Sequence, residues 1–221
     1  MKSIEQILAE NLTHEVIHIH GHEFYIERIK DCEILLDHMS QAEFNMDERL
    51  PYWAELWPSA VGLAGYVLEH GEEFNSKSVL ELGCGLGLSG IAAHRVGAQV
   101  RFTDYDQNAL AFTAKNFFRN FNLNADVQIM DWRRPQADLM FDVIIAADVL
   151  YEKRWIEPVL DTLTQMLKAD GVAFIAEPGR NVANRFFGLL TEENWEYSKI
   201  SQHFRMDDQE RQVDIYRIYK C

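Results

Sequence analysis

The segment VLELGCGLGL, residues 79–88, constrains the fold more than any other part of the chain. It begins as an apolar strand, passes through glycines at every second position and leads into a helix. Glycine is needed where a chain turns sharply and lets a ligand approach the backbone, and a helix start offers free N–H groups. The three glycines Gly83, Gly85 and Gly87 therefore predict a cofactor-binding turn at the end of a strand of a parallel sheet.

Short apolar strands alternate with helical stretches from about residue 59 onward. The predicted strands are 78–82, 99–103, 126–130, 141–146, 172–176, 196–201 and 213–219. The predicted helices are 59–70, a stretch through 92–96, 107–121, 155–167 and 181–191. This alternation is typical of βαβ units, so we expect an α/β fold with a doubly wound, Rossmann-like seven-stranded sheet. Only a polar stretch separates the last two strands, which predicts an antiparallel last strand.

The first part of the chain has a different pattern. A short helix is expected at 3–11, and the alternation over 16–29 predicts a hairpin that turns near Gly21. A length of 221 residues allows one large domain with an appendage. We therefore expect a small N-terminal cap over residues 1–56 and a cofactor-binding domain over residues 57–221.

Charge and composition exclude several classes of function. The 21 basic and 35 acidic residues give a net charge of −14, which argues against nucleic acid as a partner. No stretch approaches the roughly 18 to 20 apolar residues that cross a bilayer, and the first residues do not resemble a signal peptide, so a cytoplasmic protein without membrane contact is expected. The three cysteines and the alternating histidines have no convergent metal-ligand spacing, so no metal site is predicted.

Two carboxylates indicate the chemistry of the ligand. Asp104 ends the second predicted strand, 21 residues after Gly83, where a carboxylate can accept hydrogen bonds from ribose hydroxyls. Glu81 precedes the first glycine and suits a ligand with an amino group. A shifted register, Gly85-x-Gly87-x-x-Gly90, matches the dinucleotide fingerprint, which leaves a dinucleotide-dependent oxidoreductase as an alternative. The first glycine of that register would stand three residues past Leu82 rather than at the strand end, which counts against this alternative.

The pattern Glu81-x-Gly83-x-Gly85-x-Gly87 resembles motif I of the class I S-adenosylmethionine-dependent methyltransferases. The resemblance extends from about residue 57 to the end and implies S-adenosylmethionine as the cofactor. It also implies that Asp131, after the third strand, lies near the adenine amino group. The positions that it assigns to the cofactor are Trp57, Glu81, Gly83, Gly85, Gly87, Asp104, Asp131, Trp132 and Ala147. The alternative for the Asp-Trp pair is a carboxylate that caps a turn and an indole that packs on the core.

A narrower resemblance rests on Trp57-Pro58, the Asp-Trp pair and Asp148-x-x-Tyr151. Together they are similar to the small protein-lysine methyltransferases that modify folded non-histone proteins. This resemblance implies catalytic roles for Asp148, which would orient the substrate ammonium, and Tyr151, which would hold the amine or line its channel. The alternative for Asp148 is an N-cap of the following helix. The aromatic residues of 51–58 either pack the cap or close over the cofactor.

The predicted function is methyl transfer to an amine, with a lysine of a protein as the leading candidate. A small-molecule amine and a cofactor-binding module without catalysis are the alternatives. The acidic chain suggests a protein partner with a basic or neutral surface, and activity would then weaken as salt screens charges beyond about 8 Å. Glu177 is a second group that could meet a cationic substrate, whereas Arg180 departs from a purely acidic rim.

Overall fold

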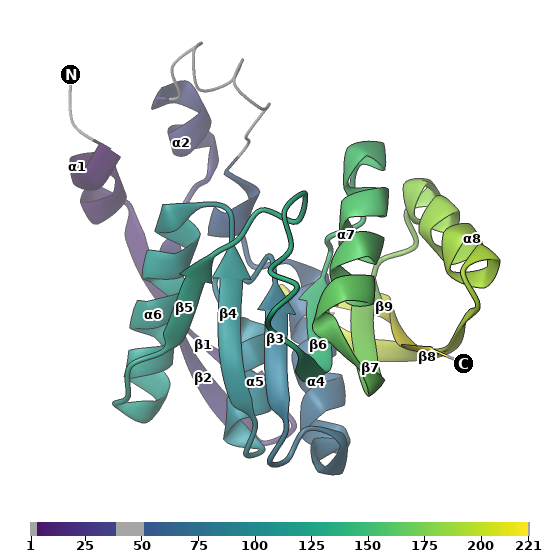
Figure 1. The fold of residues 1–221 in the computed structure, drawn as a ribbon. Helices are drawn as coiled ribbons and strands as arrows, with labels where there is room; N and C mark the ends of the chain where they lie inside the picture. Colours follow the sequence, from purple (N-terminus) through teal and green to yellow (C-terminus); the bar gives the residue numbers. More distant parts are fainter. Residues whose placement is uncertain (1–3, 39–50, 221) are drawn as a thin grey trace.

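The computed structural model describes residues 4–38 and 51–220. Its centre is a seven-stranded sheet with the strand order β5-β4-β3-β6-β7-β9-β8 (Figure 1). The bounds are β3 Ser78–Leu82, β4 Gln99–Asp104, β5 Asp126–Ile129, β6 Phe141–Ala147, β7 Leu167–Glu177, β8 Trp195–Met206 and β9 Gln209–Lys220. β9 is antiparallel to both of its neighbours, whereas the pairs among the first five strands in that order are parallel. The predicted sheet with an antiparallel last strand is confirmed.

Helices cover both faces of this sheet. α4, α5 and α6 belong to one apolar cluster, and α7 and α8 belong to the cluster on the other face. The helices are α4 Pro58–Glu69, α5 Leu88–Arg95, α6 Gln107–Phe121, α7 Lys153–Met166 and α8 Asn184–Glu192, and the 3-10 turns are η1 Tyr52–Ala54, η2 Gly71–Glu73 and η3 Asn181–Ala183. Because both faces are covered, most residues of the middle strands are apolar, and Leu80, Leu82, Ile144 and Ile145 are fully buried. Glu81 of β3 is a buried exception. Within the described ranges, no helix combines the length and the apolar content needed to span a membrane.

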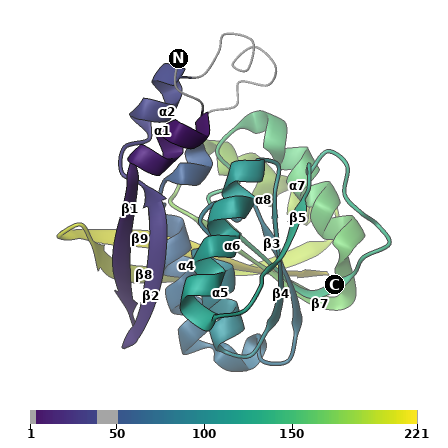
Figure 2. The same cartoon turned by 90° about the vertical axis from the view of Figure 1, so that its left-hand side faces the viewer.

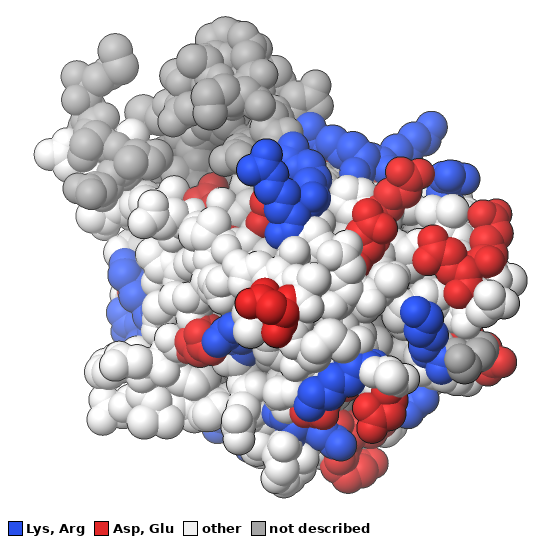
Figure 3. Space-filling model, in the orientation of Figure 1, with Lys and Arg blue, Asp and Glu red and all other residues white. Residues whose placement is uncertain are grey.

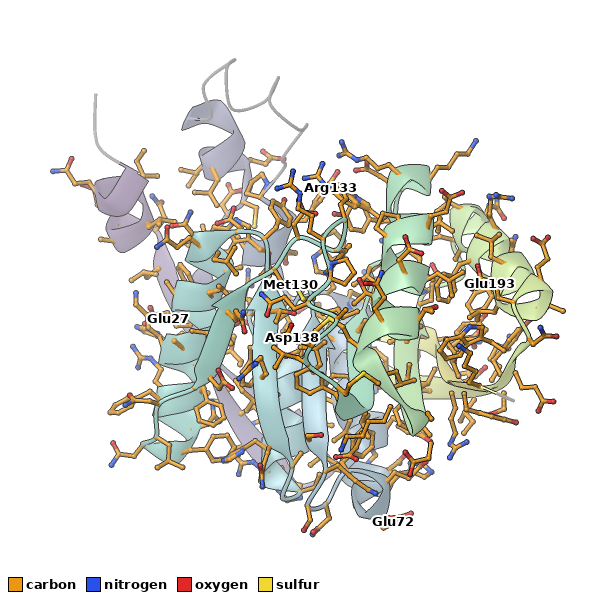
Figure 4. The ribbon with its side chains drawn as sticks, viewed as in Figure 1. Glu27, Glu72, Met130, Arg133, Asp138 and Glu193 are labelled. Atoms are coloured by element: carbon orange, nitrogen blue, oxygen red, sulfur yellow. The ribbon has the colours of Figure 1, made fainter. Side chains whose placement is uncertain are left out.

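The order of the strands reverses next to β3. β3 pairs with β4 on one side and with β6 on the other, so the chain moves outward to β5 and then returns across β3. Residues 130–140 make this return in turns. Ligands of open α/β sheets bind at the carboxyl ends of the strands beside such a reversal. In Figure 4, Arg133 lies at this upper edge of the sheet, and Glu72 lies at the opposite edge.

Three regions extend beyond their predicted bounds. β7 begins at Leu167, five residues before its predicted start, so the helix predicted over 155–167 ends at Met166 instead. β8 and β9 have 12 residues each, because they pair along their full length from Trp195 opposite Lys220 to Met206 opposite Gln209. The N-terminal hairpin begins at Leu12, four residues before its predicted start. Most of the added positions are exposed or half-buried, so they lack the apolar pattern that marks a strand in the sequence.

The N-terminal elements form a separate layer. They are α1 Ile4–Glu10, β1 Leu12–Ile19, β2 His22–Ile29 and α2 Glu33–His38. β1 and β2 pair antiparallel across a turn with φ of 47° at His20 and 78° at Gly21, as in a type I′ hairpin. Figure 2 shows this hairpin beside α6, and α6 in turn contacts β4 and β5 of the large sheet. The boundary of the cap at residue 56 stays a prediction.

Asn116 of α6 joins the hairpin to the glycine turn. Its Oδ1 accepts the N–H of Glu27 at 2.7 Å, while its Nδ2 donates to the carbonyls of Glu27 and Leu86 at 3.1 and 3.0 Å. The Glu27 side chain, labelled in Figure 4, is also buried. Burial favours its neutral form, but hydrogen bonds from Arg119 and Lys115 outweigh this and lower the pKa of Glu27.

Asn116→Ala is expected to lower the free energy of unfolding by about 2–4 kcal/mol, because three buried backbone groups lose their partner. Asn120→Ala is the matched control. Asn120 makes the same two-way amide contact with the backbone of Tyr25, at 3.1 and 2.9 Å, but in an exposed position. Water can replace that contact, so the control should cost less than about 1 kcal/mol. Urea unfolding measures both values, and equal losses would contradict a special role for Asn116.

Candidate active site

A cleft opens at the carboxyl ends of β3, β4 and β6. Ten of the eleven residues predicted for the site line it: Trp57, Glu81, Gly83, Gly85, Gly87, Asp104, Trp132, Ala147, Asp148 and Tyr151. Asp131 instead lines a smaller hollow next to it, together with Trp132 and Tyr151. The structure thus brings residues from five separate segments of the chain to one place.

The glycine turn forms the floor of the cleft. Gly83, Gly85 and Gly87 have φ of 61°, 52° and 83°, a conformation that side chains disfavour. At Gly83 a Cβ atom would also lie 2.9 Å from the Trp132 indole, and at Gly85 it would lie 3.2 Å from the carbonyl oxygen of Trp53. The turn is therefore closely packed from two sides, which explains why glycine occupies these positions.

Asp104 supports this turn as well as lining the cleft. Its Oδ2 accepts the N–H of Gly85 at 3.1 Å, and its Oδ1 accepts the N–H of Asp106 at 3.0 Å. The side chain is almost fully buried, and burial raises its pKa to about 6, although the backbone donors offset part of the rise. Each oxygen keeps a lone pair for a further donor such as a ribose hydroxyl.

Glu81 carries the most perturbed carboxylate of the cleft. It is 3% exposed, and its Oε2 has no hydrogen-bond partner among the described residues. Burial raises the pKa of Glu81 to about 8, and the negative charge of Asp104 adds to the rise. The amide of Gly90 and the hydroxyl of Ser89 offset it only in part. A buried acceptor of this kind would be satisfied by a ligand with a cationic donor.

The Asp131-Trp132 pair shows the contacts of the second predicted alternative, a turn cap and a core indole, and its role toward a cofactor stays a prediction. Asp131 is bound to the guanidinium of Arg133, which lowers its pKa, and it accepts the N–H of the same residue as a turn cap would. Trp132 belongs to the apolar core, with its ring edge-on to Trp155 at 5.5 Å, and it also lines the cleft. The indole can therefore contact an adenine ring from a fixed position, while Asp131 already has a partner of its own.

The aromatic segment before α4 lies over the glycine turn. Trp53 is buried and packs against Phe112 of α6, with ring centroids 5.3 Å apart. Tyr52 and Trp57 face the cleft, and the indole N–H of Trp57 donates to the carbonyl of Tyr52 at 2.8 Å. Trp53 thus anchors the segment on the core, and Tyr52 and Trp57 close the side of the cleft.

A second pocket adjoins the cleft at its outer end. It is lined by Tyr52, Trp57, Asp148, Tyr151, Glu152 and Arg180, and the first four of these residues also line the cleft. The ring of Tyr52 meets that of Tyr151 edge-on at 5.5 Å. Burial is the main cause that raises the pKa of Tyr151, so its hydroxyl stays protonated at neutral pH. The shared wall is where a bound cofactor and a second substrate would meet.

Asp148 stands at this junction in an unusual conformation. Its φ is 57°, and its N–H donates to the carbonyl of Ala176 on the neighbouring strand at 2.9 Å. The side chain does not cap α7, because Glu152 is the N-cap residue of that helix. Oδ1 of Asp148 instead accepts a hydrogen bond from Nε of Arg180 at 2.8 Å.

The loop after β7 differs from its expected role. The Glu177 carboxylate is buried and accepts the N–H groups of Gly179 and Arg180, so it stabilises the turn and is absent from the pocket wall. Burial raises the pKa of Glu177. Tyr105 also lines the cleft. Its only signal in the sequence is its place directly after Asp104.

Charges of both signs surround the mouth of the site. Figure 3 shows Lys and Arg side chains along the upper edge, around the start of α7 and the loop after β5, with Asp and Glu side chains between them. Several are paired, as Arg154 is with Glu152 at 2.6 Å. This edge is less acidic than the net charge of −14 suggests.

S-adenosylmethionine fits the groups in the cleft. Its ammonium group can pair with the Glu81 carboxylate, which lines the cleft and whose buried Oε2 has no partner among the described residues. Its ribose hydroxyls can donate to Asp104, and its adenine ring can contact Trp132 beside Gly83. The chemistry of the donors and acceptors therefore matches the cofactor that the sequence implies.

Comparisons with known proteins agree with this site. The family described as "Lysine methyltransferase" matches residues 43–193. Protein N-lysine methyltransferase METTL21A of Danio rerio is 30% identical over 203 residues, which cover 83% of this chain and 89% of that protein. Protein-lysine methyltransferase METTL21E of Mus musculus is 30% identical over 76% of this chain. The match spans 65% of the length of that mouse protein and 50% of its Bos taurus counterpart.

Solved structures share the fold. A putative RNA methyltransferase from Pyrococcus horikoshii has a TM-score of 0.60 at 20% identity. The superposed residues cover 86% of this chain and 95% of that protein's chain. A putative methyltransferase complexed with SAH has a TM-score of 0.62 at 14% identity. The superposed residues cover 93% of this chain and 55% of that methyltransferase's chain. These structures show that the fold is one that methyltransferases share. The family match and the relatives confirm the predicted resemblance to the lysine methyltransferases: the chain belongs to the lysine methyltransferase family.

Proposed function

We propose that this chain transfers a methyl group from S-adenosylmethionine to the side-chain amine of a lysine in a protein. The observation that carries the proposal is the junction of two cavities at Asp148 and Tyr151. The inner cavity has the acceptors for the cofactor, and the outer one has a carboxylate, a phenol and two further aromatic rings for an amine. The relatives named as protein-lysine methyltransferases support a lysine as the acceptor.

The chemistry needs positioning more than a strong base. When bound, the cofactor supplies a methyl group that its sulfonium already activates. The cleft residues would hold that methyl at the junction, and the aromatic segment would exclude water from it. Asp148 would orient an N–H of the amine, and Tyr151 would line the narrow passage. Before transfer, the lysine ammonium must lose its proton, since its ordinary pKa is about 10.4.

The substrate is proposed to be a protein with a neutral or basic surface around the target lysine. The net charge of −14 supports this. The mixed charges at the mouth indicate that the long-range attraction is weak there, so salt should reduce the rate only moderately. We place the reaction in the cytoplasm and propose neither nucleic acid nor a membrane as a partner.

Radiolabelled S-adenosylmethionine mixed with cell lysate and the purified protein tests this function. A labelled protein band that depends on the added enzyme is the expected result. Label only in the small-molecule fraction would instead support a small-molecule amine methyltransferase. Cofactor binding without any transfer would support a binding module, and both outcomes would contradict the proposal.

Asp104→Ala is expected to weaken cofactor binding by at least about tenfold, because it removes an acceptor for the ribose and for the N–H of Gly85. Isothermal titration calorimetry measures the affinity. Asp106→Ala is the matched control, since Asp106 caps α6 through Asn108 and does not line the cleft. It should cost about 1 kcal/mol of stability and leave the affinity unchanged. Equal affinity of Asp104→Ala and wild type would contradict this account of the cleft.

A further inference from the structure

The carboxylate that would meet the acceptor amine is already paired with a cation of the same chain. Nε of Arg180 donates to Oδ1 of Asp148 at 2.8 Å, and the two side chains are 36% and 7% exposed. Both line the outer pocket. A carboxylate that is paired in this way attracts a second cation less strongly than an unpaired one does.

The backbone fixes both members of the pair. Asp148 follows β6 and is tied to Ala176 of β7 through its N–H. Arg180 follows β7 in a turn whose N–H groups donate to the buried Glu177 carboxylate, at 2.5 Å from Gly179 and 2.9 Å from Arg180. Because β6 and β7 are neighbours in the sheet, the two loops deliver their charges to one point. The contact is therefore part of the architecture of the pocket.

The other described groups around the pocket leave its charge balanced. Glu152 is paired with Arg154, as Asp148 is with Arg180. The phenols of Tyr52 and Tyr151 complete the wall, and phenols ordinarily carry no charge at neutral pH. The Glu177 carboxylate lies behind the turn, where burial raises its pKa. An ammonium that enters this pocket meets no uncompensated carboxylate among the described side chains of its wall.

A methyl acceptor must present a free lone pair, so an environment that stabilises its ammonium form slows the reaction. We propose that Arg180 is a positioning residue of the acceptor site: it holds the Asp148 carboxylate and offsets its charge, so that the pocket favours the uncharged, nucleophilic amine. Asp148 then orients an N–H of the acceptor without trapping it as a cation. This inference rests on the proposed function, since it assumes an amine acceptor beside a bound cofactor.

Sinefungin provides a probe that needs no identified substrate. It is an analogue of the cofactor in which a carbon with an amine replaces the sulfonium and its methyl, so it presents a cation at the junction with the acceptor pocket. S-adenosylhomocysteine lacks that amine and serves as the internal reference. The quantity to measure by calorimetry is the Kd of S-adenosylhomocysteine divided by the Kd of sinefungin. It is compared between wild type, Arg180→Gln, Arg180→Lys and Arg185→Gln.

Arg180→Gln should raise this ratio about tenfold or more, because Asp148 then faces the amine with its charge unbalanced. Arg180→Lys keeps the cation and should stay near wild type. Arg185→Gln removes a surface cation that is paired with Glu157, and neither residue lines the pocket, so this variant should also stay near wild type. A loss of structure would weaken both ligands together and leave the ratio unchanged.

An unchanged ratio in an Arg180→Gln variant that binds S-adenosylhomocysteine as wild type does would overturn the inference. An equal rise in Arg185→Gln would also overturn it, because it would indicate a general effect of surface charge. These results would leave the proposed function intact if wild type still methylates a lysate protein. If wild type binds neither ligand, the proposed function fails, and the inference fails with it. The titrations and the lysate assay together therefore distinguish the two failures.

Discussion

Asp148→Asn is expected to lower kcat/KM for methyl transfer by about 100-fold or more, with the cofactor affinity close to that of wild type. The substitution keeps the size of the side chain but removes the negative charge that would orient the acceptor amine. It also leaves the Arg180 guanidinium without its carboxylate beside the acceptor, where it repels any ammonium that enters. Losses of about 100-fold are common when a group that orients the reacting atoms is displaced. Steady-state transfer of radiolabel to the lysate protein measures the effect.

The control for this variant is Asp161→Asn, the same chemical change at an exposed position of α7. It should leave kcat/KM within about twofold of wild type, as surface substitutions usually do. A variant at Asp148 that retains more than about a tenth of the wild-type activity would show that the acceptor site lies elsewhere in the molecule. A variant that loses cofactor affinity in the same proportion would indicate damage to the cleft rather than loss of the acceptor contact.

Glu81→Gln is expected to weaken cofactor binding by about 10- to 100-fold, since a hydrogen bond to a charged group contributes about 1.5–3 kcal/mol. The cofactor-free protein should become more stable at the same time. The pKa of Glu81 is about 8 in the folded chain, well above its ordinary value of 4.5, so folding favours the protonated acid. The wild type therefore loses stability as the pH rises from about 4.5 to about 8.

The glutamine variant lacks this pH-dependent loss. Thermal unfolding without cofactor should show that the variant is more stable than wild type and that the difference between them grows as the pH rises from about 5 to about 8. Calorimetry in two buffers with different ionisation enthalpies adds a second test, because wild type should release close to one proton when the cofactor ammonium binds near neutral pH. The variant should release fewer protons, since its amide has no acidic proton to lose. Equal proton release by the two proteins would disprove the assignment of the ammonium to Glu81.

Local patterns in the sequence are enough to predict the frame of the site. The alternation of strands and helices predicts the sheet, and the strand before Gly83 predicts where the cleft opens. Asp104 and Asp148 are found because one ends a strand and the other directly follows one, and the carboxyl ends of parallel strands meet at one edge. All of these signals are short in sequence, and they depend on backbone geometry rather than on long-range packing.

The electrostatic state of the site depends on contacts that the sequence does not reveal. Arg180 and Asp148 are 32 residues apart and meet only because β6 and β7 are adjacent. That Oε2 of Glu81 has no partner among the described residues follows from the packing of α5 against β3. Glu177 turns inward because its own loop offers two N–H groups to its carboxylate. Each of these contacts is determined by which groups the tertiary fold places next to one another.

The proposed function requires that a lysine of a protein is methylated at the junction beside Asp148. Peptide mass spectrometry of a lysate treated with S-adenosylmethionine and either wild type or Asp148→Asn tests it most directly. The account predicts an added methyl group on a lysine Nζ in the wild-type reaction and little or none with the variant. A methyl group on another type of residue, or equal lysine methylation by both proteins, would contradict it.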